Sequence, residues 1–155
     1  MVFRTLARLT GERDGLEDMA QEVFLRLFKA LPHFRGEAAV ATFLYRIIVN
    51  VVNDEFSERK KARMMSPIED AAGRELVSST AGAAVQVERA QLQEAVDAGL
   101  LELPARDRAI LTLHYQEGRS YEEIAAILDL KMGTVKTHLF RAREKLRNTM
   151  KEWSR

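Results

Sequence analysis

The amino-acid sequence predicts an all-α protein made of two small helical domains joined by a flexible linker. Three observations predict this fold class. Apolar residues recur at helical spacing along most of the 155 residues, and only three prolines interrupt them. Residues 64–85 have no such period and contain Pro67, two glycines and many small residues. We therefore expect an N-terminal domain over 1–63, a linker over 64–85 and a C-terminal domain over 86–155.

The composition is that of a globular protein, with 46% hydrophobic and 30% charged residues. The chain has no cysteine, which excludes a disulfide framework and a thiolate metal site. Its apolar runs are much shorter than the roughly 20 residues of a membrane-spanning helix, so we expect no direct membrane insertion. The first residues, "MVFRTLARLTGERD", do not have the pattern of a secretory signal. These features are compatible with a reducing cytosol but do not by themselves establish it.

The first half of the chain is predicted to contain two long helices. Over 15–31, Met19, Val23, Leu27 and Ala30 form one apolar stripe, and Pro32 ends the helix. A loop around Gly36 follows, over 33–41. The next helix, 42–63, is expected to begin with Thr42 as its N-cap, and it ends in a basic cluster from Arg59 to Arg63.

The second half returns to helical order. Helices are expected over 87–103 and 105–118, the second closed by Gly118. Ser120 and Glu123 have the spacing of a capping box and predict the start of another helix. A three-residue turn, Asp129–Lys131, separates it from the basic stretch "KMGTVKTHLFRAREKLR". Helix, short turn and basic helix are the pattern of a DNA-binding helix-turn-helix.

The basic helix has two faces. Val135, Leu139, Ala142 and Leu146 form a stripe that is expected to be buried. Turning about 100° per residue places Lys136, Thr137, Phe140 and Arg141 together on the outward side. An exposed phenylalanine between cations suits a DNA major groove, where arginine and lysine contact guanine or phosphate and apolar groups contact thymine methyls. The alternative is a solvated face that packs on another helix.

Two parts of the chain resemble a known family. "LPARDRAILTLHYQEGRSYEEIAAILDLKMGTVKTHLFRAREKLR" closely resembles region 4 of bacterial extracytoplasmic-function (group 4) sigma factors of the sigma-70 family. "DGLEDMAQEVFLRLFKALPHFRG" with "ATFLYRIIVNVVND" resembles their region 2. The resemblance implies a transcription initiation factor that binds core RNA polymerase through the β′ clamp and the β flap. It also implies binding to promoter DNA and regulation by an anti-sigma factor, possibly membrane-linked. Such a factor is cytoplasmic, and nucleoid-associated when active.

The resemblance also implies roles for individual residues. By matched position, the −35 element is read by the C-terminal helix-turn-helix through Lys136, Thr137, Phe140 and Arg141. Apart from the resemblance, we expect Thr134, at the helix N-terminus, and Arg143 to contact the same DNA, with phosphate or polymerase the better-suited partner of Arg143. The −10 element is opened by the N-terminal domain, through Phe34, Arg35, Gly36, Glu37, Val40, Arg46 and Asn50. The polymerase clamp is contacted by Asp18, Gln21, Glu22 and Arg26.

The chain departs from the family pattern at four places. Phe43 stands where tryptophan is usual, Val40 where an aromatic residue is common, and Asp129 at the usual turn glycine. The first helix of region 2 is expected to be short, either because this copy has a shortened helix or because the start of the sequence is trimmed.

Other functions have less support in the sequence. His33, His114 and His138 have no metal-ligand spacing, and no nucleotide-binding or nucleophile motif is present, so we expect no metal, no cofactor and no enzyme activity. Two alternatives stay open: a helix-turn-helix transcription regulator with an unrelated helical sensor, and a sigma-like interaction protein that does not initiate transcription.

Overall fold

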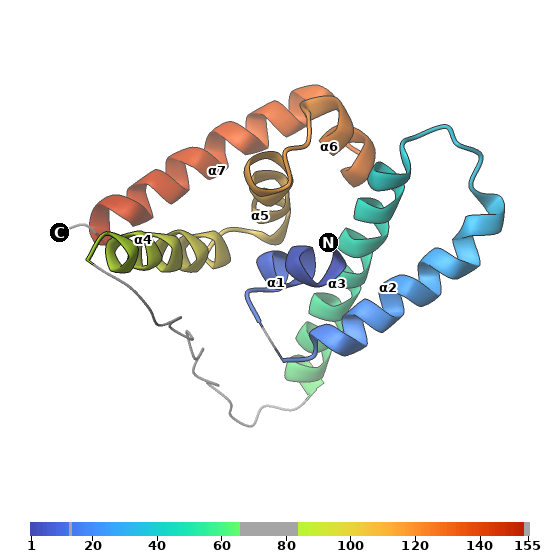
Figure 1. The fold of residues 1–155 in the computed structure, drawn as a ribbon, viewed down its shortest axis with the longest axis horizontal. Helices are drawn as coiled ribbons and strands as arrows, with labels where there is room; N and C mark the ends of the chain where they lie inside the picture. The colour runs from blue at the N-terminus through green and yellow to red at the C-terminus, as the bar shows by residue number, and fades with distance from the viewer. Residues whose placement is uncertain (13, 66–83, 154–155) are drawn as a thin grey trace.

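The computed structural model describes residues 1–12, 14–65 and 84–153, and within these ranges it contains helices and no strand (Figure 1). Residues 66–83 of the predicted linker lie outside the described residues, while 64–65 belong to the preceding helix and 84–85 to the following one. The helical segments are α1 (Val2–Thr10), α2 (Leu16–Ala30), the 3-10 turn η1 (Leu31–His33), α3 (Val40–Met65), α4 (Ala84–Leu101), α5 (Ala105–Leu111), the π-helical turn η2 (Thr112–Gln116), α6 (Tyr121–Leu128) and α7 (Met132–Trp153). The all-α prediction is confirmed.

The N-terminal half is a three-helix arrangement. α2 and α3 lie side by side in opposite directions, and α1 packs on both (Figure 1). Leu6, Val23 and Ile48, one from each helix, are fully buried, and each such side chain stabilises the fold by about 1.5–3 kcal/mol. The predicted stripe on α2 is confirmed at Met19 and Val23, which are both buried.

The expected N-cap of α3 is wrong. The helix begins at Val40, two residues before Thr42, and Thr42 is buried in its first turn. The backbone N–H of Phe43 donates to the carbonyl of Ala39 at 3.1 Å, so Ala39 accepts the first helical hydrogen bond. Val40 therefore belongs to the start of α3 and not to the preceding loop.

The C-terminal half is built around the long helix α7. α4 and α5 pack against α7, and α6 joins it at its N-terminal end (Figure 1). Gly99 lets α4 approach closely, because a Cβ at this position would lie 2.7 Å from Leu146 Cδ1. The core includes Ile110, Leu113, Ile124 and Leu139.

The helix predicted over 105–118 has two parts. It begins as the α-helix α5 and widens at Thr112 into η2, where the N–H of Glu117 donates to the carbonyl of Thr112 at 3.0 Å. Such π-turns occur often at functional sites. The chain then turns at Gly118, whose positive φ of 66° suits glycine.

The two halves are in contact in this structure. α1 packs on α5, and α3 packs on α6. Buried apolar residues of both halves form one continuous cluster, to which Leu6 and Ile48 contribute from one side and Ile110 and Ile124 from the other. Figure 1 shows α1 at the centre of the molecule, between α3 and α5.

Candidate nucleic-acid interface

α6, the turn and α7 form the predicted helix-turn-helix. The capping box is present: the N–H of Glu123 donates to Ser120 Oγ at 3.1 Å, and the N–H of Ser120 donates to the Glu123 carboxylate at 2.8 Å. The turn has the predicted three residues. Asp129 adopts the left-handed conformation, with φ 53°, and the N–H of Leu130 donates to the carbonyl of Ala125 at 2.9 Å. The capping box holds the start of α6, and the bond from Leu130 holds the turn against the end of α6.

The predicted buried stripe of α7 is confirmed. Val135, Leu139 and Ala142 are buried, and Leu146 packs against the core. A polar contact adds to this packing, since His138 Nδ1 lies 2.6 Å from the Asp107 carboxylate of α5. The orientation of α7 is therefore set by its own domain.

The opposite side of α7 carries the four residues predicted to read DNA, which we call the α7 reading face: Lys136, Thr137, Phe140 and Arg141. All four are exposed, and the Phe140 side chain is 66% exposed. The Thr137 hydroxyl donates to the carbonyl of Gly133 at 3.0 Å. Within the described residues, Lys136 and Arg141 make no hydrogen bond or ion pair. Two free cations and an uncovered aromatic ring thus share one helix face.

The N-terminal end of α7 adds a second feature. Thr134 is half-buried, and the space where a Cβ of Gly133 would stand is open. The first N–H groups of a helix carry a partial positive charge, which suits a phosphate. Here the N–H of Thr134 donates to the carbonyl of Lys131 at 2.9 Å, so the N–H of Gly133 is the better candidate for such a contact. Thr134 and Gly133 therefore lie beside the reading face in a position compatible with backbone contact to DNA.

Arg143 does not lie with the reading face. Its guanidinium carbon is 5.2 Å from the centre of the Tyr115 ring, and its Nε is buried without a hydrogen-bond partner in the described residues. It lines a groove of about 490 Å³ between α4, η2 and α7, whose apolar walls include Leu100 and Leu146. The structure thus separates Arg143 from the other residues of the predicted −35 set.

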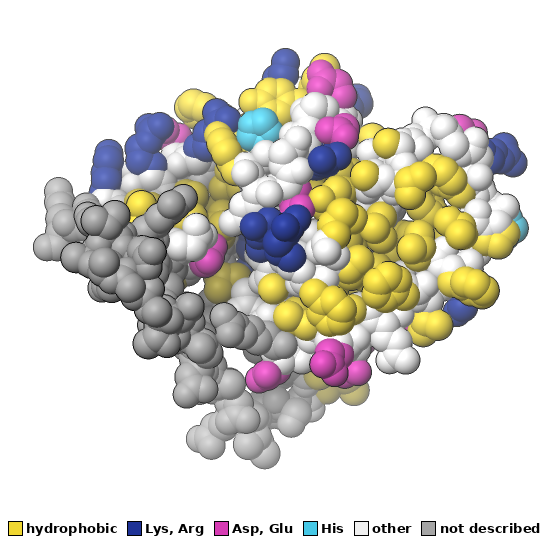
Figure 2. Space-filling view, in the orientation of Figure 1, with side chains coloured by type: hydrophobic (Ala, Val, Ile, Leu, Met, Phe, Trp, Pro, Cys, Tyr) yellow, Lys and Arg dark blue, Asp and Glu magenta, His cyan; other side chains and the backbone are white. Residues whose placement is uncertain are grey.

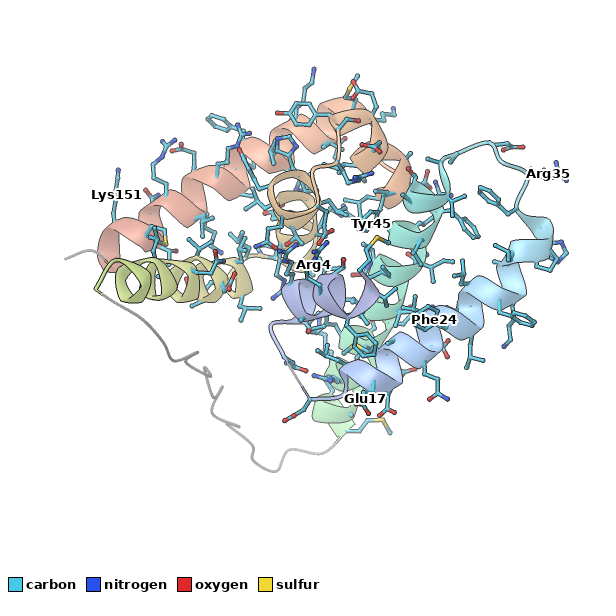
Figure 3. The ribbon with its side chains drawn as sticks, viewed as in Figure 1. Arg4, Glu17, Phe24, Arg35, Tyr45 and Lys151 are labelled. Atoms are coloured by element: carbon cyan, nitrogen blue, oxygen red, sulfur yellow. The ribbon has the colours of Figure 1, made fainter. Side chains whose placement is uncertain are left out.

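The residues predicted to act on the −10 element surround the loop between η1 and α3. Arg35, Gly36, Glu37 and Val40 are exposed, and Arg35 projects from this loop at the end of the molecule opposite Lys151 (Figure 3). Phe34 is half-buried, its ring centre 4.9 Å from that of Phe43. These residues are brought together at one end of the N-terminal half.

Arg46 and Asn50 lie one turn apart on the exposed side of α3. The Arg46 guanidinium donates to the backbone carbonyl of Ala126 in α6. One predicted −10 residue is therefore engaged by the C-terminal half of the same chain.

The predicted clamp residues share one face of α2. Asp18 and Gln21 are exposed, while Arg26 forms ion pairs of 2.6 Å with Glu22 and with Asp54 of α3. Hydrogen bonds to Glu22 and Asp54 raise the pKa of Arg26 further above its ordinary value. Arg26 thus holds α2 to α3 as well as lying on the predicted face.

Beside these charges lies an apolar surface that the sequence prediction did not single out. We call it the α2 apolar patch, formed by Phe24, Leu25, Phe28 and Leu31. All four are exposed, Phe28 by 78%, and they border a shallow hollow. Figure 2 shows hydrophobic side chains gathered over α2, where Figure 3 places Phe24. The sequence could have indicated the α2 apolar patch, because α2 carries more apolar residues than one buried stripe requires.

A second feature missed from the sequence is the environment of Glu117, which lies between the halves with its side chain only 1% exposed. Its carboxylate accepts hydrogen bonds from Arg8 Nη1 at 2.8 Å, Thr5 Oγ1 at 3.2 Å and the Tyr45 hydroxyl at 2.7 Å. Burial opposes its ionisation, but the bonds from Tyr45 and Arg8 outweigh burial, and the pKa of Glu117 is lowered. Burial and the bond to Glu117 raise the pKa of Tyr45 to about 12.

Among the described residues, no group of three or more histidine, aspartate or glutamate side chains is placed to hold a metal ion. In the same part of the chain, no helix has the length and apolarity required to cross a bilayer.

Comparisons with known proteins match both halves. The family described as "Sigma-70 region 2" matches residues 1–62, and "Sigma-70, region 4" matches residues 93–146. The chain is 32% identical over 148 residues to the "RNA polymerase sigma-H factor" of Pseudomonas aeruginosa, covering 92% of this chain and 77% of that protein. It is 34% identical over 138 residues to the "ECF RNA polymerase sigma-E factor" of Escherichia coli K12, covering 84% and 71%.

Solved structures show the same fold. The sigma factor RpoE of Bartonella quintana, crystallised with the anti-sigma factor NepR, superposes with a TM-score of 0.77 at 23% identity, covering 97% of this chain and 89% of that one. CnrH, solved with the cytosolic domain of CnrY, superposes with a TM-score of 0.65 at 22% identity, covering 97% and 81%.

Proposed function

Because the chain belongs to the extracytoplasmic-function group of the sigma-70 family, we propose that it binds core RNA polymerase and directs it to a small set of promoters. The observation that carries this proposal is the α7 reading face, where Lys136, Arg141 and Phe140 are exposed on a helix held by its other side. The chain supplies recognition and catalyses nothing by itself, since nucleotide addition is the work of the polymerase. It acts in the cytoplasm, at the nucleoid.

At the −35 element, α7 enters the major groove. Arg141 and Lys136 donate to guanine O6 and N7 or to phosphate, while Phe140 and the Thr137 methyl contact thymine methyls. A phosphate rests on the N–H of Gly133 at the start of α7, next to Thr134. Arg143 is left out of this contact because it faces the groove beside Tyr115.

At the −10 element, the loop that begins at Phe34, together with Val40 at the start of α3, captures bases of the opened strand. Stacking an unpaired base on an aromatic ring contributes roughly 1–3 kcal/mol. Phe34 is the aromatic residue nearest this position, and Arg35, Arg46 and Asn50 supply polar contacts.

The protein partners bind the remaining exposed surfaces. The clamp of the polymerase contacts Asp18, Gln21, Glu22 and Arg26, together with the α2 apolar patch, whose exposed area suits a protein better than DNA. The β flap contacts the C-terminal half. An anti-sigma factor, possibly membrane-linked, regulates the chain by competing for these surfaces. The complex of RpoE with the anti-sigma factor NepR supports this proposal.

Selection of DNA from a random library by core polymerase, with and without the chain, tests the proposal. We expect the chain to enrich two sequence motifs at a fixed spacing, and only when polymerase is present. Enrichment of one motif by the chain alone would favour a helix-turn-helix regulator. Binding of the chain to polymerase without any enrichment would favour a non-initiating interaction protein.

A further inference from the structure

We propose that Glu117 is a latch that closes the free chain, and that the two halves must separate at this residue before the chain can contact both promoter elements. The effect of the latch on promoter contact rests on the proposed function, whereas the closing contact at Glu117 does not. It concerns a contact within the chain and needs no inhibitor.

The latch joins one carboxylate of the C-terminal half to several donors of the N-terminal half. Arg8 and Thr5 of α1 donate to Oε1, and Tyr45 of α3 donates to Oε2. A further cation, Arg4 of α1, has its Nη2 3.7 Å from Oε2. Figure 3 shows Arg4 and Tyr45 on either side of this region, where α1, α3 and α5 meet. A buried carboxylate is tolerated only when its oxygens are hydrogen-bonded, and here the donors Arg8, Thr5 and Tyr45 all belong to the other half.

η2 places Glu117 at this point. The wider turn carries the backbone of Glu117 to the end of the helix, and Gly118 with its positive φ reverses the chain directly afterwards. Arg8 also donates to the carbonyl of Gln116 at 3.2 Å, so α1 contacts both the backbone and the side chain of this turn.

Other contacts join the same two halves. The guanidinium of Arg119 lies 5.5 Å from the centre of the Tyr45 ring, and Arg46 donates to the carbonyl of Ala126. Gly11, which ends α1 with φ 71°, faces Leu101 so closely that a Cβ would lie 2.3 Å from Leu101 Cδ2. The hydrogen bonds of this interface can be replaced by bonds to water when the halves separate, which makes closure reversible.

The closed arrangement cannot contact both promoter elements. Arg46, on the proposed −10 surface, touches Ala126, which precedes Lys136 by only ten residues. Ten residues span at most about 36 Å even when extended. The −35 and −10 elements lie about 25 base pairs apart, or about 85 Å along the duplex at 3.4 Å per base pair. The α7 reading face is exposed in the closed form, so the latch does not hinder contact with the −35 element alone.

A distance measurement in the free protein tests the latch. The chain has no cysteine, so Ser57→Cys on α3 and Asn148→Cys on α7, both exposed, allow a pair of fluorescent dyes to report the separation of the halves. We expect Glu117→Ala to shift the energy-transfer distribution toward longer distances and to lower the closed population at least fivefold. Glu122→Ala, which removes an exposed glutamate of α6, should leave the distribution unchanged.

Tyr45→Phe provides a second variant from the other half. It removes only the hydroxyl that donates to Glu117, and circular dichroism verifies that each variant keeps its helix content. We expect it to open the chain in the same direction by a smaller factor. An unchanged distribution in both variants would overturn the latch.

A second measurement separates the latch from the proposed function. For a duplex carrying only the −35 motif recovered by the library selection, Glu117→Ala should change affinity less than twofold. With limiting chain, it should raise the yield of polymerase–promoter complex. Glu117→Ala could open the chain while neither the variant nor the parent chain forms a polymerase–promoter complex. That result would overturn the proposed function and not the latch.

Discussion

Replacing Arg141 by alanine should weaken recognition of the −35 element without harming the fold. Arg141 is exposed and makes no hydrogen bond or ion pair within the described residues, so its loss should change the free energy of unfolding by no more than about 0.5 kcal/mol. A two-bond contact of arginine to guanine discriminates by about 1–3 kcal/mol. At 1.4 kcal/mol per factor of ten, affinity should fall roughly 5- to 150-fold.

The assay is a fluorescence anisotropy titration of the holoenzyme with a promoter duplex and with the same duplex carrying a scrambled −35 element. Arg147→Ala is the matched control, because it removes one positive charge from an exposed position of the same helix, where Arg147 pairs with Glu144 at 2.6 Å. We expect Arg141→Ala to lose most of the preference for the intact element, and Arg147→Ala to keep it. An equal effect of the two variants would mean that α7 contributes only charge, and the reading face would be wrongly assigned.

Four further predictions concern DNA contact, the latch and the fold. Phe140→Ala should lower affinity severalfold on a duplex containing thymine, and the loss should shrink when the −35 thymines are replaced by deoxyuridine, which lacks the methyl. Affinity of the full chain for its promoter duplex should fall steeply with salt, with a slope of about −0.9 per phosphate contacted, and a flat series would favour a helix-packing role for α7. Because the pKa of Glu117 is lowered in the closed form, its contribution to closure is complete above the ordinary glutamate pKa of about 4.3. This contribution is lost as the pH falls through the lower pKa of the closed form, and energy transfer that does not change below pH 4 would contradict it. Ser120→Ala should destabilise the chain by about 1 kcal/mol in urea unfolding, through loss of the capping box.

Local patterns in the sequence predicted the local structure of the C-terminal half. The capping box at Ser120, the three-residue turn and the buried stripe of α7 depend on residues within a few positions of one another, and the structure confirms all three. The outward placement of Lys136 and Arg141 follows from the same periodicity.

The same periodicity also bears on Arg143, which was predicted among the −35 residues. Arg143 follows Leu139 by four residues, which places it about 40° from a buried position and not among the outward residues. The structure accordingly finds it half-buried beside Tyr115. The N-cap of α3 was mispredicted for a different reason. Threonine favours the N-cap position locally, but tertiary packing buries Thr42, and a local preference cannot predict such packing.

Contacts between distant parts of the chain could not be predicted. Glu117 meets Thr5 and Arg8 across more than one hundred residues, and no local pattern distinguishes it from a solvent-exposed glutamate. Its role depends on how the two halves pack together. A prediction of two domains on a flexible linker does not define that packing. The α2 apolar patch is similar, since only the fold shows which of the apolar residues of α2 are left uncovered.

Run-off transcription shows whether the chain directs polymerase to a start site. Core RNA polymerase is supplied with a promoter recovered by the library selection, with and without the chain, and the 5′ ends of the transcripts are mapped. We expect transcripts that begin at one site downstream of the −10 motif, appear only when the chain is added, and decline with Arg141→Ala. Binding of the chain to polymerase without any chain-dependent start site would contradict this expectation.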